Sequence, residues 1–239
     1  LGEGWKLNLG EVEAALGAGG RLVVLASPAH PTGRIIPADE LRGIARITRK
    51  HKAMVMCDER AAHLAAKDLP SALEFLEDRF VCIRTIQNTG GKGQPPFRIT
   101  YAVNVGVKDE QVRSMFAIAG LNPPALPATA KIIDAFKESS NLAFAREVAQ
   151  RIDVACSKLD TMHASYYKPE GGLWMFPRIN IQGFRATEFV RELLRARMIA
   201  VSPGDAFGPY PDHIGLSLTP SPSTLIQGLE KIKEALTVA

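Results

Sequence analysis

The chain has 239 residues, of which 46% are hydrophobic and 23% charged, and its formal net charge is +4, a composition typical of a globular protein with its own core. Its basic residues are scattered and only 7% of the residues are aromatic, so we expect no nucleic-acid partner, whose surface would need clustered cations and stacking rings. No apolar run approaches the ~20 residues of a membrane span, and we expect no membrane partner.

The cysteines argue against metal and disulfide chemistry. Cys57, Cys82 and Cys156 lie far apart in apolar surroundings and form no CxxC pair, so the sequence predicts neither a metal site nor a disulfide framework. No targeting signal is visible at the start, and we expect a cytoplasmic or other reducing compartment. The chain opens in mid-pattern at Leu1, as a fragment or a processed product would.

Apolar runs and amphipathic helices alternate in the first half of the chain. Residues 21–27 predict a buried strand, and residues 37–51 predict a helix. Further strands are predicted at 53–57, 80–86 and 99–105. Strands separated by helices indicate an α/β fold with a mostly parallel sheet. In such sheets ligands bind beyond the carboxyl ends of the strands.

The second half has shorter elements. A Pro-rich stretch at 122–127 leads into a long helical region from residue 128 to about residue 163. The sequence then changes from Lys168 onward, which is typical of a second, smaller α+β domain. Its predicted elements are a strand near Asn180, a helix at 186–197, strands at 199–202 and 214–219, and a closing helix at 223–236.

Five motifs in a fixed order carry a resemblance to a known family. Between about residue 21 and residue 236, the sequence resembles the class I/II aminotransferases, which are PLP-dependent transferases of fold type I. The motifs are "SPAHPTGR" at 27–34, "MCDE" at 56–59, "PFRITYAV" at 96–103, "PEGGLWMF" at 169–176 and "SPGDAFG" at 202–208.

The resemblance implies a domain organisation and a chemistry. Residues 1–135 would be the C-terminal part of the large PLP-binding-type domain, and residues 136–239 the small C-terminal α+β domain. The implied cofactor is pyridoxal 5'-phosphate, which serves as an electron sink in amino-group transfer between an amino acid or amine and a keto acid. The implied partner is a homodimer mate, or a complementing chain that supplies the missing N-terminal half.

Two residues match cofactor contacts of the family. Asp58, at the end of a predicted strand, matches the acid that holds the protonated pyridine nitrogen. Arg98, just before another strand, matches the arginine that binds the cofactor phosphate through two parallel hydrogen bonds. Without the resemblance, the same residues would be interpreted as a turn aspartate and a surface arginine.

The position of the lysine that bonds covalently to PLP in the family can be interpreted in two ways. In the family it lies eight residues before the arginine, which is Gly90 here, whereas the nearest lysine is Lys92, six residues before Arg98. Either the loop is two residues shorter and Lys92 is that lysine, or the lysine has been lost. Thr89 matches the hydroxyl residue that often precedes the lysine, and Gln87 replaces the more distant phosphate-binding serine.

Three further positions depart from the family. His30 replaces an asparagine that hydrogen-bonds the PLP ring oxygen; its imidazole can donate one hydrogen bond, but it also suits a plain turn beside two prolines. Ala61 replaces a tyrosine that reaches the same oxygen. Gly215 replaces the arginine that pairs with the substrate carboxylate, and His213, two residues earlier, is a poor substitute.

These departures leave three hypotheses open. The first is an active aminotransferase in which Lys92 is the catalytic residue, Asp58, Arg98, His30 and Thr89 bind the cofactor, and the substrate is a small molecule, an amino acid or an amine. The second is a catalytically silent aminotransferase-like subunit or domain with a structural or assembly role. The third is a module that binds PLP, or a similar anionic ligand, without turnover.

Overall fold

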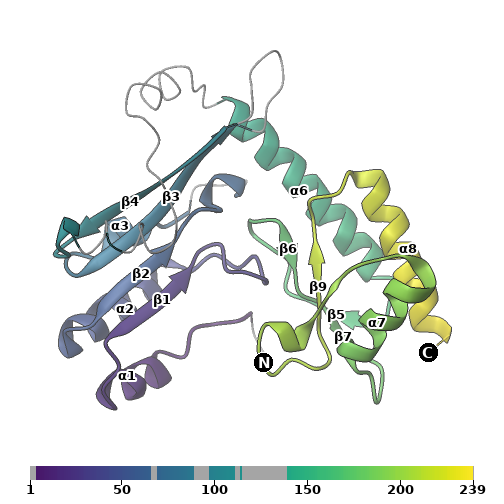
Figure 1. The fold of residues 1–239 in the computed structure, drawn as a ribbon, viewed down its shortest axis with the longest axis horizontal. Coiled ribbons are helices and arrows are strands. Elements are labelled where there is room, and N and C mark those ends of the chain that lie inside the picture. Colours follow the sequence, from purple (N-terminus) through teal and green to yellow (C-terminus); the bar gives the residue numbers. More distant parts are fainter. Residues whose placement is uncertain (1–3, 66–68, 89–96, 111–113, 115–138, 239) are drawn as a thin grey trace. The chain divides into compact units, whose positions relative to one another are not determined.

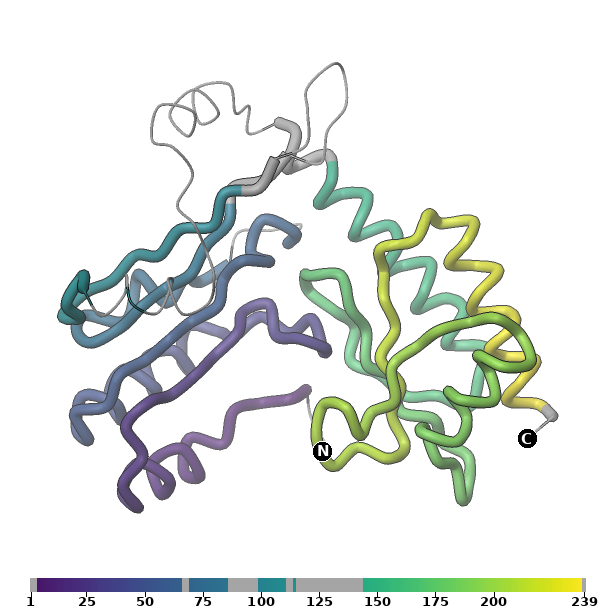
Figure 2. The backbone as a smooth tube through the Cα atoms, viewed as in Figure 1, coloured from purple at the N-terminus to yellow at the C-terminus, as the bar shows by residue number. Residues whose placement is uncertain are grey.

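The computed structural model describes residues 4–65, 69–88, 97–110, 114 and 139–238. For 86–88, 97–98, 139–143 and 238 it describes the backbone alone. The chain divides into two compact units. The sheet unit comprises Lys6–Ser27 and Ile35–Phe144, and the C-terminal unit comprises Leu1–Trp5, Pro28–Arg34 and Ala145–Ala239. The tube of Figure 2 follows the chain through both units. The domain boundary expected between residues 135 and 136 lies outside the described residues and stays a prediction.

A four-stranded sheet forms the sheet unit, with the strands in the order β1-β2-β3-β4 (Figure 1). The strands β1, β2 and β3 run parallel, and β4 lies antiparallel beside β3. The α/β fold with a mostly parallel sheet is therefore confirmed, and all four predicted strands are present. Their bounds are β1 Leu22–Ala26, β2 Met54–Asp58, β3 Phe80–Asn88 and β4 Phe97–Val105.

One face of this sheet carries the hydrophobic core. Alternate residues of β1, β2 and β3 pack against the helices α2 (Ala38–His51) and α3 (Ala72–Phe75). Helix α1 (Leu9–Gly17) adds Leu16, which packs with Ile47 of α2. The core of the unit comprises Leu25, Ile36, Leu41, Ile44, Val55, Cys57, Ala72, Leu76, Phe80 and Cys82.

The opposite face of the sheet is apolar along β1 and carries an acidic residue at the carboxyl end of β2. Side chains alternate along a strand, so Leu22 and Val24 point away from the core, and they are 44% and 59% exposed. Met56 pairs with Val24 across the sheet and is half-buried. Asp58 follows on this same face at the carboxyl end of β2.

Two helices, the greater part of a third from Ala145 onward, and short strands make up most of the C-terminal unit. Helices α6 (Ser139–Leu159), α7 (Ala186–Arg197) and α8 (Pro222–Val238) accompany a two-stranded sheet, β5-β7, and a three-stranded sheet, β6-β9-β8. Lys158 Nζ of α6 lies 2.6 Å from Glu230 Oε1 of α8, which links these helices. The strands are β5 Ala164–Ser165, β6 Trp174–Met175, β7 Arg178–Ile179, β8 Ser202–Pro203 and β9 Ile214–Ser217. Two short 3-10 helices lie among the described residues, η1 (Ala62–Leu64) in the sheet unit and η2 (Gly204–Ala206) in the C-terminal unit.

The predicted elements of this unit are mostly confirmed. The helix predicted at 186–197 is α7 at both ends, and the closing helix is one residue longer at its start and two at its end than 223–236. The strand predicted at 199–202 is wrong, because only Ser202 and Pro203 pair with β9. An apolar run becomes a strand only where a partner strand accepts its hydrogen bonds. The first part of the long helix predicted from residue 128 lies outside the described residues.

Candidate functional site

Asp58 lies where the sequence predicted it, at the carboxyl end of the central strand β2. Its carboxylate is paired with Arg60, two residues further on. Arg60 Nε lies 2.9 Å from Oδ1 and 3.1 Å from Oδ2, and Arg60 Nη2 donates to Oδ2 at 2.7 Å. Burial by itself would raise the pKa of Asp58, but the hydrogen bonds and charge of Arg60 outweigh it and hold that pKa below its ordinary value. The carboxylate is therefore ionised at neutral pH.

Glu59, the next residue, points to the opposite side and has a different task. Its side chain is 1% exposed and accepts hydrogen bonds from the Ser71 hydroxyl, at 2.8 Å to Oε2, and from the Ala72 amide, at 2.6 Å to Oε1. Arg84 of β3 donates its Nε to the same carboxylate at 2.9 Å. Glu59 thus joins β2, β3 and the start of α3, and it is a structural acid that the sequence reasoning did not assign.

The buried cysteines beside this acid are unreactive thiols. Burial, and next the charge of Glu59, raise the pKa of Cys57, and the same causes raise that of Cys82 to about 12. Nucleophilic cysteines need the opposite shift, because the thiolate is the reactive form.

In the C-terminal unit, the loop at residues 28–34 is held by a close backbone contact. Gly33 has a φ of +69°, and a Cβ there would lie 2.5 Å from Pro169 Cβ and 2.8 Å from the Gly171 oxygen. The Glu170 amide donates to the Gly33 carbonyl at 2.9 Å. The motifs at 27–34 and 169–176, far apart in the sequence, therefore meet at a position that only glycine suits.

His30, carried by this loop, lies among aromatic rings. Its ring centroid is 4.7 Å from that of Trp174 and 5.3 Å from that of Phe207. Burial lowers the pKa of His30, so the imidazole is neutral at neutral pH. A neutral imidazole carries one donor and one acceptor, which meets the hydrogen-bonding role that the resemblance implies for this position.

Phe207 also occupies the space next to Gly215. A Cβ built on Gly215 would lie 2.9 Å from Phe207 Cε2 and 3.2 Å from Ser202 Cβ. The position where the resemblance implies a carboxylate-binding arginine thus lacks a side chain and is closed by an aromatic ring. A larger residue would fit there only if Phe207 moved.

His213 is committed to other partners. Its ring stacks on Phe176 with centroids 4.9 Å apart, and Nδ1 lies 2.7 Å from Asp212 Oδ1. Arg178 Nε approaches the second oxygen of Asp212 at 2.6 Å. His213 is 6% exposed and does not substitute for the missing arginine in this arrangement.

The other predicted site residues lie wholly or partly outside the described residues. Lys92, Thr89 and Gly90 fall in the range 89–96, so the alternatives for the lysine stay predictions. The backbone of Arg98 belongs to β4 and pairs with Gln87 of β3, whereas its side chain is not described. Asp58 belongs to the sheet unit and His30 to the C-terminal unit. Arg60 is the residue near Asp58 that sequence reasoning missed, although side chains two apart on an extended chain share a face.

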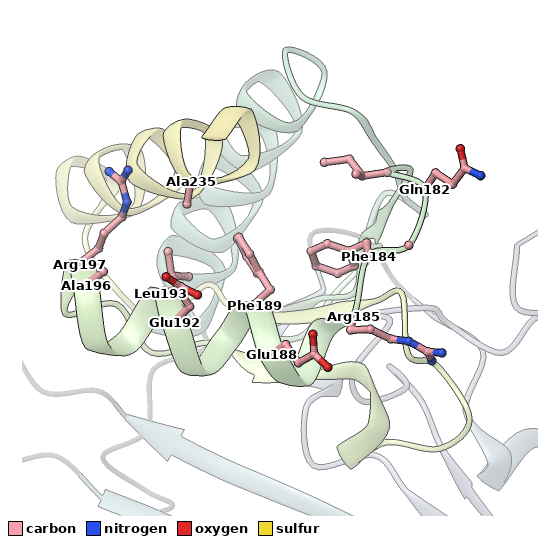
Figure 3. Close-up of a pocket in the computed structure, with 12 residues that line it drawn as sticks. Gln182, Phe184, Arg185, Glu188, Phe189, Glu192, Leu193, Ala196, Arg197 and Ala235 are labelled. Atoms are coloured by element: carbon pink, nitrogen blue, oxygen red, sulfur yellow. The ribbon is translucent and has the colours of Figure 1, made fainter. Parts of the chain in front are cut away.

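A groove of about 430 Å³ runs along α7 in the C-terminal unit (Figure 3). The rings of Phe184 and Phe189 lie in it with centroids 5.2 Å apart, and Glu188 and Arg185 lie at the same end. None of its lining residues is a predicted site residue.

The described residues give two further findings. In this part of the chain, no group of three or more His, Cys, Asp or Glu side chains is placed to hold a metal ion. Of the helices described, none has the length and apolar content that a membrane span requires.

Comparison with known proteins places these features in a family context. The pattern that defines aminotransferases of class I and II matches residues 2–232. The chain is 27% identical over 241 residues to an aspartate aminotransferase of Thermococcus kodakarensis, covering 100% of this chain and 61% of the relative. It is 26% identical over 246 residues to one of Geobacillus stearothermophilus, covering 95% and 60%.

A solved structure shares the fold. The aspartate aminotransferase of Thermotoga maritima superposes with a TM-score of 0.78 at 23% identity, over 97% of this chain and 60% of that one. The likeness confirms the fold-type-I architecture expected from the motifs. The chain spans about three fifths of the length of the relatives it matches.

Proposed function

Because the chain belongs to the class I and II aminotransferases, we propose that this protein transfers amino groups between an amino acid or amine and a keto acid with PLP as its cofactor. The observation that carries the proposal is the ionised carboxylate of Asp58 at the carboxyl end of a buried parallel strand. Such an edge is where α/β sheets bind ligands. An acid there suits the ring nitrogen of a pyridoxal cofactor.

Two described residues each have side-chain chemistry that suits one part of this cofactor. We assign the ring nitrogen to the Asp58 carboxylate of the sheet unit, and from the motif match we assign the ring oxygen to His30, whose neutral imidazole has one hydrogen bond to donate. We assign the phosphate to Arg98 and Thr89 from the motif match. When bound, PLP supplies an electron sink.

We assign Lys92 as the residue that attaches the cofactor covalently and moves the proton during transfer. A lysine can act as a general base when burial or a neighbouring cation lowers its pKa. The assignment supposes a loop two residues shorter than in relatives. Gly90, at the standard spacing, has no side chain that could do this.

The substrate class follows from Gly215 and Phe207. With no arginine at residue 215 and the Phe207 ring beside it, this described position offers an aromatic wall and no cation for a carboxylate. Substrates that gain little from a carboxylate contact, such as amines and apolar amino acids, suit this surface best.

The proposal is tested by incubating the protein with PLP, an amine or amino-acid donor and a keto-acid acceptor, and measuring the new amino acid. We expect turnover by the wild type and by Lys108→Ala, which removes an exposed lysine elsewhere, and none by Lys92→Ala. Turnover by Lys92→Ala at the wild-type rate would refute the assignment of the lysine.

A second candidate is a catalytically silent subunit. Two features favour it. Arg60 already pairs with the Asp58 carboxylate, and Ala61 has no side-chain hydrogen-bond donor where the family has a tyrosine. This candidate predicts no turnover with any donor. It also predicts that the protein still assembles, with its homodimer mate or with a complementing chain, through the exposed residues of β1.

A further inference from the structure

Arg60 surrounds the carboxylate of Asp58 more completely than a chance surface contact would. Its backbone amide donates to Oδ1 at 3.0 Å, while its guanidinium donates to both oxygens, at 2.9 Å and 3.1 Å from Nε and 2.7 Å from Nη2. One residue therefore contributes four hydrogen bonds, and three of them carry its positive charge. This is the strong two-pronged form of an arginine–carboxylate pair.

The residues that pair with Asp58 across the described sheet carry no charge that could neutralise its carboxylate. Across the sheet Asp58 pairs with Ala26 on β1 and with Ile83 on β3, and both are uncharged. Glu59 is turned to the opposite side, where it is held by Arg84. The guanidinium is thus the charged group that faces the Asp58 carboxylate among the described residues.

A carboxylate that is already neutralised attracts a second cation less strongly. Both oxygens accept hydrogen bonds from a full positive charge, so an incoming protonated ring nitrogen would meet a nearly neutral pair and the repulsion of the guanidinium. A neutral ring nitrogen meets no such repulsion. The Arg60 side chain is 58% exposed, so it competes with a ligand for the carboxylate instead of sealing it.

We propose that Arg60 is a positioning residue that pairs with the Asp58 carboxylate. Because of this pairing, the site binds a pyridine ring with an uncharged nitrogen in preference to one with a cationic nitrogen. The proposal rests on the proposed function in one respect, that a pyridoxal ring binds at Asp58. It adds that Asp58 contributes less to cofactor binding here than an unpaired carboxylate would.

The pair itself is tested first on the full chain without cofactor, by following the carboxyl carbon of Asp58 by NMR as the pH is lowered. In Arg60→Gln the pKa of Asp58 should rise above its wild-type value. Arg60→Lys keeps the positive charge but cannot form the two parallel hydrogen bonds of a guanidinium, so its Asp58 pKa should lie between those of the wild type and Arg60→Gln. Arg49→Gln removes an exposed arginine that pairs with Glu77 and should leave Asp58 unchanged. An unchanged pKa in Arg60→Gln would overturn the proposal.

The ligand is tested with PLP itself, through its dissociation constants for the wild type, Asp58→Asn, Arg60→Gln and the double variant. Asp58→Asn should weaken PLP binding by less than about twofold in the wild type but about tenfold in the Arg60→Gln background, the order of one charge-assisted hydrogen bond. A tenfold loss in the wild type itself, an equal effect in both backgrounds, or no binding by Arg60→Gln would each contradict the proposal. The proposed function fails separately, through absence of covalent attachment at Lys92, which neither measurement requires.

Discussion

Gly33 shows how a single residue fixes the loop that carries His30. Its positive φ and the contacts with Pro169 and Gly171 leave no room for a side chain. Gly33→Ala should therefore lower the free energy of unfolding by about 2–4 kcal/mol, the combined cost of a left-handed residue and of overpacking. Denaturant unfolding measures the change.

Gly183 provides a matched control for that prediction. It also has a positive φ, of +79°, but nothing lies within 4 Å of the position of its Cβ. Gly183→Ala should cost about 1 kcal/mol, the conformational part alone. Equal losses for the two variants would mean that the contact between the loop and residues 169–171 does not constrain Gly33.

His30 makes the folding stability depend on pH. Burial lowers its pKa in the folded chain, so the unfolded chain binds the proton more readily. The stabilising contribution of the neutral ring is present above the unfolded pKa of about 6.5 and is lost as the pH falls through the folded pKa. The decline in unfolding free energy from pH 8 to pH 5 should be smaller in His30→Asn than in the wild type. An identical decline in both would show that His30 titrates equally in the folded and unfolded chains.

At the scale of elements, Glu59 links two strands and a short helix. Glu59→Ala leaves Arg84 without its partner and the Ser71 hydroxyl without its acceptor. Removing one member of a buried pair costs about 3–5 kcal/mol, and we expect a loss of that order in thermal or denaturant unfolding.

The control for Glu59 is Glu77, which pairs with Arg49 at the surface, where the two side chains are 76% and 65% exposed. Exposed pairs contribute little, so Glu77→Ala should unfold like the wild type. A loss in Glu59→Ala no larger than in Glu77→Ala would show that the buried acid does not hold α3 to the sheet.

The sequence predicted the strands of the sheet and helix α2 because each has a strong pattern of its own. Helix α1 was not predicted, although its signal is present: Asn8 caps it by accepting a hydrogen bond from the Glu11 amide, and Leu9, Val12 and Leu16 have helical spacing. The strand at 199–202 was misplaced because pairing with β9 is decided by tertiary structure.

The candidate site was predictable only in part, for a similar reason. Motif order identified Asp58 and His30, but the partners of their side chains depend on packing that no motif contains. Arg60 is close in sequence and on the same side of an extended segment, so its pairing with Asp58 could have been inferred. The contact of Phe207 with Gly215 could not, because η2 and β9 meet only in the folded unit.

For the whole molecule, β1 ends the described row of strands and carries exposed Leu22 and Val24. An apolar edge strand is a pairing surface for another chain. Val24→Lys should therefore reduce self-association in sedimentation experiments over a range of protein concentrations. Leu194→Lys, on a 48% exposed residue of α7, should leave it unchanged. Loss of association in Leu194→Lys alone would place the interface on the other unit.

We propose that this protein binds PLP covalently through Lys92, and covalent trapping tests that attachment most directly. The protein is mixed with PLP, reduced with borohydride and digested, and the peptides are analysed by mass spectrometry. We expect a pyridoxyl group on the peptide that contains Lys92 and no comparable labelling of exposed Lys108. Labelling of Lys108 and other surface lysines to the same extent as Lys92, or none at Lys92, would contradict it.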